Sequence, residues 1–219
     1  MLAGMTLDRD LSQTTLEHFR REAADPHPMP AGVAIAAVSA GFALALVAKV
    51  LAVTGRRHTP PEAAARLEPL AAAAQAASRR MLQLAGDDVA AFEEYLAARR
   101  LPRGSDSERE ARQRAIDSAV RRAIDLPLAA AEEAAAGLRL CSEVCAFTPA
   151  ALTADLGVTA DLLASALRSF LLCAESNVRQ LTPEGTSFRE RVAAEAERHA
   201  EALQLAAAVL ERARFTTDR

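Results

Sequence analysis

Residues 33–53 read VAIAAVSAGFALALVAKVLAV, and this stretch decides the fold. It is apolar on every side of a helix, with Lys49 as its only charge. Such a helix must be buried in protein or in lipid, and its length of roughly 31 Å, at about 1.5 Å per residue, suits either. Alanine is its commonest residue, and small residues allow neighbouring helices to approach closely. We therefore predict the buried central helix of a bundle, with a membrane span as the alternative.

The composition extends this prediction to the whole chain. Half of the 219 residues are hydrophobic, aromatic residues are scarce, and most of the remainder are good helix formers. No segment shows the apolar–polar alternation of a strand. The sequence predicts an all-α, single-domain bundle over residues 1–219 with about seven helices around residues 33–53. The predicted helices are 6–24, 33–53, 60–99, 105–125, 127–147, one that follows 155–158, and a last one that starts at Thr182.

Charge and composition also limit the kinds of partner and compartment. The formal net charge of −3 argues against nucleic acid as the main partner. The first thirty residues lack the apolar region of a signal peptide, and the three cysteines are best interpreted as reduced core residues. These features predict a cytoplasmic protein without a membrane partner. The four histidines lack the spacing of metal ligands, so no metal site is predicted.

The most informative pattern lies in the predicted helix 60–99. Nine residues there follow a regular 3, 4, 3, 4 spacing, which is typical of a seam that packs against a partner helix. All are apolar or amphipathic except Asp88. They are Leu67, Leu70, Ala74, Ala77, Met81, Leu84, Asp88, Ala91 and Tyr95. The neighbouring Asp87 falls off the seam and is expected to face water.

A carboxylate on a buried face is costly unless something compensates it. Burial raises its pKa, whereas a nearby cation or hydrogen-bond donors lower it. Two interpretations of Asp88 therefore stay open. It is either a structural residue paired with an arginine or a backbone amide, or a general acid/base in a cleft between helices.

Other polar positions have simpler interpretations. Asn177 ends an apolar stripe and is expected to cap its helix. His199 lies in the apolar stripe of the last helix and is expected to be a hydrogen-bonded core histidine. Arginines outnumber acids between Arg99 and Arg122. This stretch is a solvated face or, alternatively, a site for an anionic ligand such as a glutamate tail.

Several segments together resemble the formiminotetrahydrofolate cyclodeaminase / methenyltetrahydrofolate cyclohydrolase family, which is all-helical. The resemblance covers roughly Phe19 to Leu210 and depends on the order and spacing of the segments, since no single one is specific. The segments are Pro28-Met29-Pro30-Ala31-Gly32, Thr54-Gly55-Arg56-Arg57, Leu84-Ala85-Gly86-Asp87-Asp88-Val89-Ala90-Ala91-Phe92, Leu101-Pro102-Arg103, Leu126-Pro127-Leu128, Ala154-Asp155-Leu156-Gly157-Val158 and Asn177-Val178.

The resemblance implies folate one-carbon chemistry. Asp88 matches the family's general acid/base position, and Gly32, Asp155 and Asn177 would bind the substrate. The substrate would be a tetrahydrofolate derivative, possibly polyglutamylated, and no further cofactor would be needed because the reacting carbon is already electrophilic. The resemblance and the long seam together predict a homodimer.

The chain also departs from the family pattern. The family typically has P-G-G-G-S before the central helix, where this chain has Pro30-Ala31-Gly32-Val33-Ala34. Glycines at those positions would let a ligand approach backbone N–H groups. The loss of two of them favours the alternative function, a non-catalytic helical scaffold or interaction protein with an eroded folate site.

Overall fold

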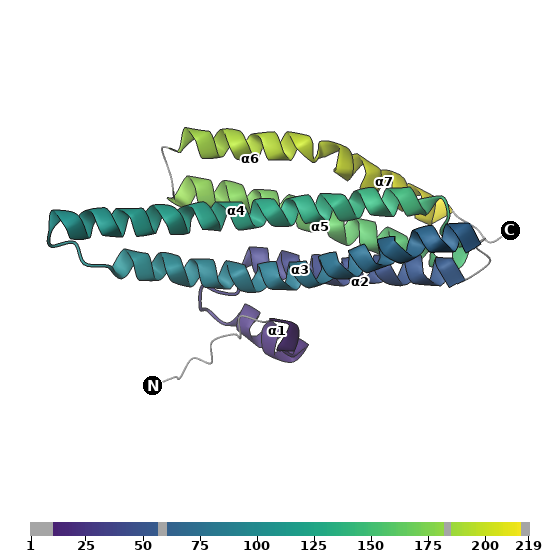
Figure 1. Ribbon diagram of the computed structural model, residues 1–219, viewed down its shortest axis with the longest axis horizontal. Coiled ribbons are helices and arrows are strands. Elements are labelled where there is room, and N and C mark those ends of the chain that lie inside the picture. Colours follow the sequence, from purple (N-terminus) through teal and green to yellow (C-terminus); the bar gives the residue numbers. More distant parts are fainter. Residues whose placement is uncertain (1–10, 57–60, 182–184, 216–219) are drawn as a thin grey trace.

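The computed structural model describes residues 11–56, 61–181 and 185–215, and these residues form an all-α bundle (Figure 1). The all-α prediction is confirmed. The described residues contain one short 3-10 helix and seven α-helices. They are η1 (Leu11–Gln13), α1 (Leu16–Ala24), α2 (Gly32–Arg56), α3 (Pro61–Arg100), α4 (Asp106–Cys145), α5 (Ala150–Leu181), α6 (Thr186–Arg198) and α7 (Ala200–Phe215).

Helices α2 to α5 form a four-helix bundle. Each packs against the next in the order α2, α3, α4, α5, and α5 returns to pack against α2. Helix α7 covers α4 and α5, on the side of the bundle opposite α1 (Figure 1). Helices α3 and α4 have 40 residues each, whereas α2 has 25. Because α2 begins part of the way along its longer neighbours, the interior of the bundle is less covered where α2 starts.

Helix α2 is the predicted central helix. Six of its alanines and Val47 are buried, and Gly41 marks the close approach of α3. A Cβ atom at Gly41 would lie 3.3 Å from the carbonyl oxygen of Ser78, and the Ser78 hydroxyl donates a 2.7 Å hydrogen bond to the Gly41 carbonyl. The helix continues beyond the predicted end at residue 53 to Arg56, and no glycine in a left-handed conformation ends it.

The seam of α3 faces helices of the same chain. Leu67, Ala74 and Met81 are buried in the hydrophobic core, and a Cβ at Gly41 of α2 would touch Met81. The seam is therefore filled within one protomer and gives no support to a dimer. The homodimer itself stays a prediction.

Helix α4 is one continuous helix where two helices, 105–125 and 127–147, were predicted. A capping box of Ser105 and Glu108 starts the helix, in agreement with the predicted start at residue 105. The predicted break at Pro127 is wrong, because the helix runs through this proline to Cys145. Proline is favoured at a helix start but is tolerated inside a helix when the freed carbonyl finds another donor.

The remaining boundaries also differ from the prediction. Residues 155–158 lie inside α5, which begins earlier, directly after the Thr148-Pro149 break. The single predicted last helix is two helices, α6 and α7, separated at His199. The predicted start at Thr182 and the prolines at positions 60 and 183 lie outside the described residues. One merged pair and one divided helix leave the number near the predicted seven.

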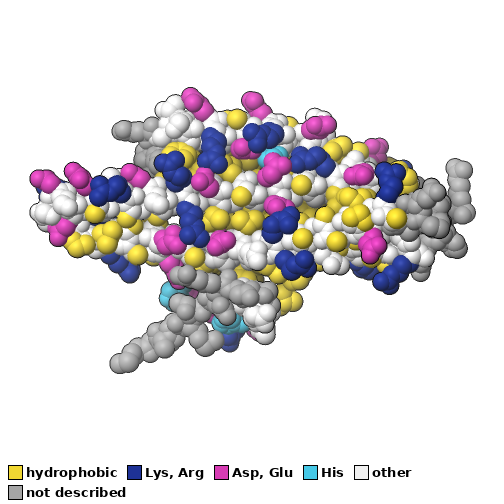
Figure 2. Space-filling view, in the orientation of Figure 1, with side chains coloured by type: hydrophobic (Ala, Val, Ile, Leu, Met, Phe, Trp, Pro, Cys, Tyr) yellow, Lys and Arg dark blue, Asp and Glu magenta, His cyan; other side chains and the backbone are white. Residues whose placement is uncertain are grey.

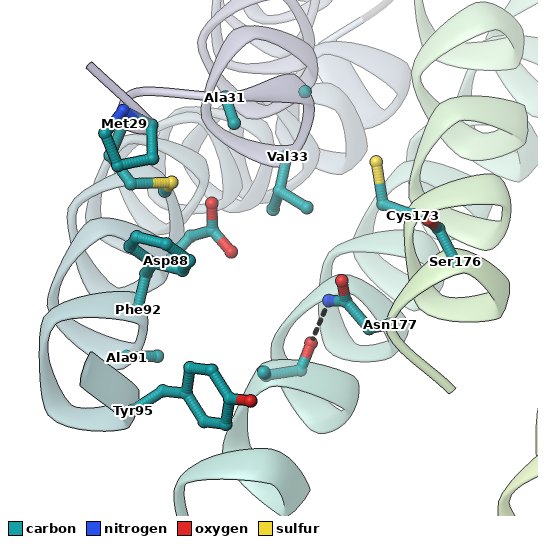
Figure 3. A pocket seen from close by; sticks show the side chains of 13 residues that line it. Met29, Ala31, Val33, Asp88, Ala91, Phe92, Tyr95, Cys173, Ser176 and Asn177 are labelled. Carbon is teal, nitrogen blue, oxygen red and sulfur yellow. Dashed lines mark hydrogen bonds between the residues drawn. The ribbon is translucent and has the colours of Figure 1, made fainter. Parts of the chain in front are cut away.

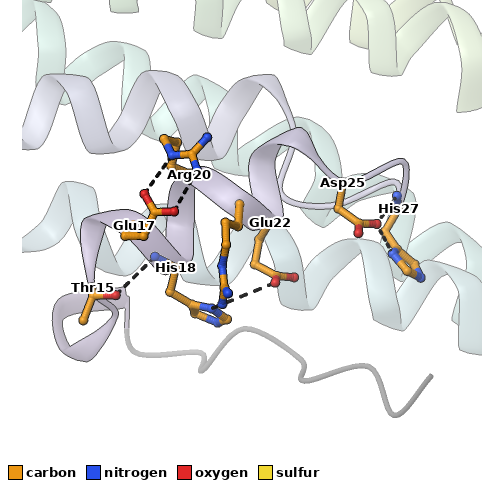
Figure 4. Close-up of polar contacts among 8 residues, drawn as sticks. Thr15, Glu17, His18, Arg20, Glu22, Asp25 and His27 are labelled. Atoms are coloured by element: carbon orange, nitrogen blue, oxygen red, sulfur yellow. Dashed lines mark hydrogen bonds and ion pairs between the residues drawn. The ribbon is translucent and has the colours of Figure 1, made fainter.

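The N-terminal segment leads into the bundle through α1. Thr15 caps α1 by accepting the backbone N–H of His18, and Glu17 pairs with Arg20 (Figure 4). The helix ends at Asp25, whose carboxylate accepts the backbone N–H of His27. Residues 25–31 contain no helix, in agreement with the predicted helix end at residue 24, and carry the chain to the start of α2.

The surface and the apolar helices bear on possible partners. On the face in Figure 2, basic and acidic side chains are interspersed, with no large area of one sign. Two helical segments, Gly32–Arg56 and Ala150–Arg179, are long and apolar enough to cross a membrane, but 61% and 56% of their apolar windows are buried inside the bundle. Helices α2 and α5 also carry exposed apolar side chains, namely Ile35, Phe42, Val158, Leu162 and Leu172.

Candidate active site

A pocket of about 220 Å³ opens where α2 begins, and all four helices of the bundle contribute to it (Figure 3). Most of its lining is apolar, and the polar side chains that face it come from α3 and α5. The lining residues are Pro28, Met29, Ala31, Gly32, Val33, Asp88, Ala91, Phe92, Tyr95, Ala123, Cys173, Ser176 and Asn177. The pocket therefore occupies the part of the bundle interior that the shorter α2 leaves uncovered.

Asp88 is the acidic residue of this pocket. Its side chain comes from α3 and is only 8% exposed, as the seam predicts. Among the described residues, none forms a hydrogen bond or ion pair with its carboxylate. Burial alone raises the pKa of Asp88 from 3.8 to about 6. The geometry therefore lacks the arginine or amide partner that a purely structural aspartate would need.

The adjacent Asp87 provides an internal contrast. One residue along an α-helix turns the side chain by about 100°, so Asp87 leaves the buried face. It is exposed and lies 3.2 Å from the guanidinium of Arg122, which also pairs with Glu94. Of the two acids in this segment, only Asp88 reaches the pocket.

Gly32 lies at the start of α2 on the pocket wall. A Cβ atom there would lie 3.2 Å from Sγ of Cys173 on α5, so glycine leaves space between the two helices. The first hydrogen bond of α2 is donated by Ile35 to Ala31, which leaves the N–H groups of residues 32–34 without partners in the helix. These groups and the helix dipole make this wall favourable for electron-rich atoms of a ligand.

Asn177 enters the pocket from α5 and does not cap its helix as predicted, because α5 continues to Leu181. Its amide nitrogen instead donates a 2.7 Å hydrogen bond to the backbone carbonyl of Ala123 on α4. Ala123 is four residues before Pro127, whose missing N–H would otherwise bond this carbonyl. Asn177 thus supplies the hydrogen-bond donor that the Ala123 carbonyl lacks within α4, so the helix can continue beyond Pro127.

Asp155 lies apart from the other predicted site residues. It does not line the pocket, and its carboxylate forms a 2.9 Å ion pair with Lys49. Lys49 is 17 residues after Gly32, which corresponds to about 25 Å along α2. The structure therefore brings Gly32, Asp88 and Asn177 together and places Asp155 elsewhere. Its predicted binding role stays a prediction.

Several pocket residues were not predicted from the sequence. Phe92 lies four residues after Asp88 and shares its helix face, so the spacing could have identified it. Cys173 and Ser176 lie near Asn177 on α5, where the spacing gives a weaker signal. Met29 belongs to the irregular segment before α2, and no local pattern indicates its position.

The arginine-rich stretch is largely paired. Arg109 contacts Asp106, Arg114 pairs with Glu110, and Arg122 pairs with two acids, as expected for a solvated face. Arg99 differs because its guanidinium lies over the ring of Tyr95, 5.8 Å from the centroid. Since Tyr95 lines the pocket, Arg99 is the member of this stretch that lies beside it.

His199 occupies a separate cluster away from the pocket. It is fully buried as predicted, but neither ring nitrogen has a hydrogen bond, so that part of the prediction is wrong. Its Nε2 atom lies 3.4 Å from Glu195 and 3.6 Å from Glu132. These three residues could together hold a cation, although Arg198 and Arg139 already pair with the two carboxylates.

Comparisons with known proteins agree on one family. The sequence model of the formiminotransferase-cyclodeaminase family matches residues 15–198. A methenyltetrahydrofolate cyclohydrolase from Methylorubrum extorquens is 32% identical over 130 residues, which are 59% of this chain and 59% of that protein. A formimidoyltransferase-cyclodeaminase from Sus scrofa is 28% identical over 187 residues, 84% of this chain but 35% of that protein.

The aligned regions thus span well under two thirds of these curated relatives. Among solved structures, formiminotetrahydrofolate cyclodeaminase from Thermotoga maritima superposes with a TM-score of 0.78 and 21% identity, covering 92% of this chain and 98% of that one. At this identity the superposition shows a shared fold. The extent of the family match, by contrast, decides membership.

Proposed function

The chain belongs to the formiminotransferase-cyclodeaminase family, and we propose that it is an enzyme of folate one-carbon metabolism with Asp88 as its general acid and base. The substrate would be a tetrahydrofolate derivative carrying a methenyl bridge or a formimino group. The observation that carries the proposal is the buried, unpaired carboxylate of Asp88 on the wall of the pocket. The non-catalytic scaffold is not favoured by the comparisons.

The proposed acid/base role follows from the raised pKa. A carboxyl group with a pKa of about 6 can both accept and return a proton near neutral pH. As a cyclohydrolase, Asp88 would take a proton from the water that attacks the methenyl carbon. It would then pass this proton to N5 as the C–N5 bond breaks, while the second water proton leaves to solvent and the formyl group stays on N10.

The cyclodeaminase reaction would use the same group. N10 would attack the formimino carbon, and Asp88 would remove the proton of N10 as the new bond forms. Asp88 would return a proton to the departing nitrogen, which leaves as ammonia. In both reactions the carbon is bonded to two nitrogens at the critical step and is already electrophilic, so we propose that no metal or redox cofactor takes part.

The size of the pocket suggests which part of the substrate it would hold. Its volume of about 220 Å³ is below the usual range for a complete ligand of drug-like size. We therefore place the one-carbon unit and its ring system inside, where Phe92 and Tyr95 supply aromatic walls. The glutamate tail would extend past Tyr95 toward Arg99.

Assembly and location are part of the same proposal. Ile35 on α2 and Leu162 and Leu172 on α5 are exposed and line one open groove, which a second copy of the chain would cover. The three cysteines are free, in keeping with a reducing, cytoplasmic environment.

The direct test compares two neighbouring acids. We expect Asp88→Asn to lower kcat by about 10²- to 10⁴-fold, because the amide cannot exchange a proton. The matched control is Asp87→Asn, which changes the exposed acid beside it and should stay within about twofold of wild type. Turnover is measured by the absorbance of methenyltetrahydrofolate and, for the other substrate, by ammonia release. An unchanged rate in Asp88→Asn would remove Asp88 from the mechanism.

A further inference from the structure

Pro127 interrupts the hydrogen bonding of α4 at the pocket. Because proline has no N–H, the carbonyl of Ala123, four residues earlier, has no partner within the helix. Pro127 is buried, and Ala123 is half-buried on the pocket wall. A shielded carbonyl without a donor is costly, so another group must satisfy it.

The side chain of Asn177 provides that donor. Its amide nitrogen lies 2.7 Å from the Ala123 carbonyl oxygen. The reversed amide would place its oxygen against this carbonyl oxygen, which is unfavourable because both are acceptors. The carbonyl that Pro127 leaves free therefore determines which end of the Asn177 amide faces α4.

The other end of the amide faces the pocket. In Figure 3 the Asn177 oxygen points away from Ala123 and into the space that Asp88 borders from the opposite wall. With its nitrogen committed to α4, Asn177 presents an acceptor to a ligand. Asp88 and the amide oxygen of Asn177 thus face one pocket from two different helices.

We propose that Pro127 is a positioning residue that acts through Ala123 and Asn177 to fix a hydrogen-bond acceptor on the wall opposite Asp88. This acceptor selects ligands that present an N–H donor there, such as the ring N–H or amino group of a reduced pteridine. The inference rests on the proposed function for the identity of the ligand. The coupling between Pro127 and Asn177 is a property of the chain alone.

A second proline inside a helix provides the matched control. Pro69 lies within α3 but is exposed, and so is Ala65, the residue whose carbonyl it leaves free. Water can satisfy that carbonyl, so no side chain has to be recruited. Pro69→Ala thus reports the general effect of restoring a helical N–H, at a site that does not line the pocket.

The first experiment is a double-mutant cycle on thermal stability. Asn177→Ala should lower the melting temperature by about 4 °C, because the Ala123 carbonyl loses its donor. In the Pro127→Ala background, residue 127 supplies that donor, and Asn177→Ala should change the melting temperature by less than about 1 °C. Equal shifts in the two backgrounds would overturn the coupling.

The second experiment measures turnover of methenyltetrahydrofolate. Pro127→Ala should raise KM by about 3- to 10-fold, the effect of one weakened hydrogen bond, while kcat stays within about twofold because Asp88 is unchanged. Asn177→Ala alone should raise KM by a similar factor. Pro69→Ala should leave KM unchanged. A merely structural role of Pro127 would alter stability without this rise in KM.

The outcomes separate this inference from the proposed function. If wild type turns over substrate and Pro127→Ala has the same KM, the positioning role is wrong although the function stands. If wild type neither turns over these substrates nor binds 5-formyltetrahydrofolate in calorimetric titration, the proposed function fails. The ligand-selecting part of the inference then fails as well, whereas the double-mutant cycle on thermal stability still tests the coupling between Pro127 and Asn177.

Discussion

Two acids that the sequence analysis assigned to one site, Asp88 on α3 and Asp155 on α5, lie beside different parts of α2 and have different surroundings. Asp88 lies beside the start of α2, is buried, and has no described partner for its carboxylate. Asp155 lies about 25 Å further along, is 37% exposed, and pairs with Lys49. The presence of an acid in a family-like segment therefore says less about its role than its burial and its counter-ion.

The physical difference lies in the cost of each charge. An exposed acid beside an ammonium group is stabilised by both water and its partner. A buried acid without a cation retains its proton to higher pH, which is the state that a general acid needs. Variants that change the surroundings of each acid should therefore have different effects at Asp88 and at Asp155.

The largest expected effect on stability comes from Asp88 itself. Its pKa of about 6 in the folded chain is above the unfolded value near 3.8. Well below pH 3.8 the group is protonated in both states. As pH rises to 6, the unfolded chain releases the proton first, and wild type loses about 3 kcal/mol of unfolding free energy. Asp88→Asn should lack this loss.

The measurement is urea denaturation of wild type and Asp88→Asn at pH 4 and pH 7. The stability of the variant relative to wild type should rise by about 2 kcal/mol between the two pH values, since part of the loss has already occurred at pH 4. Other carboxyl groups titrate in both proteins, so the difference isolates Asp88. Parallel pH profiles would mean that Asp88 is solvated or paired in solution, like Asp155.

An intermediate effect should follow from giving Asp88 a partner. Phe92 lies one turn after Asp88 on the pocket wall, so Phe92→Lys places an ammonium group within reach of the carboxylate. The added ammonium group should lower the pKa of Asp88, and kcat should drop by about 3- to 10-fold because a more acidic carboxyl group is a weaker base toward the attacking water or N10. The same urea experiments and kinetics measure both changes.

Phe92→Met is the control, since it also replaces the aromatic ring with a flexible chain but adds no charge. If Phe92→Lys and Phe92→Met had the same pH profile and the same kcat, the missing cation would not explain why Asp88 differs from Asp155. In that case the aromatic ring, and not the charge, would be the important feature of position 92.

The sequence predicted the parts of the fold that depend on local pattern. The apolar stretch 33–53 specified α2, and the 3, 4 spacing put Asp88 on a buried face. The predicted break at Pro127 was wrong because the carbonyl of Ala123, which Pro127 leaves free, accepts a hydrogen bond from Asn177, 54 residues after Ala123. No local rule contains that contact. The division at His199 likewise has no proline or glycine to indicate it.

The site was predictable to a similar extent. Gly32, Asp88 and Asn177 were identified from pattern and resemblance, and they line one pocket. Asp155 was assigned by the same resemblance, but its partner Lys49 lies 106 residues away, so its pairing could not be anticipated. The spacing of residues along the sequence predicts in which helix a residue lies and which face it occupies. Its counter-ion depends on which helices pack together in the folded chain.

The smallest effect is expected at the opposite end of α2. Lys49→Met removes the ammonium partner of Asp155 and keeps the apolar stem, and both charged groups are substantially exposed, at 58% and 37%. We expect a loss of no more than about 1 kcal/mol in urea denaturation and unchanged kcat and KM, because water replaces the ion pair. Lys49→Arg, which keeps the pair, should match wild type. A large loss of turnover in Lys49→Met alone would bring Asp155 back into the site, and burial would no longer be what distinguishes the two acids.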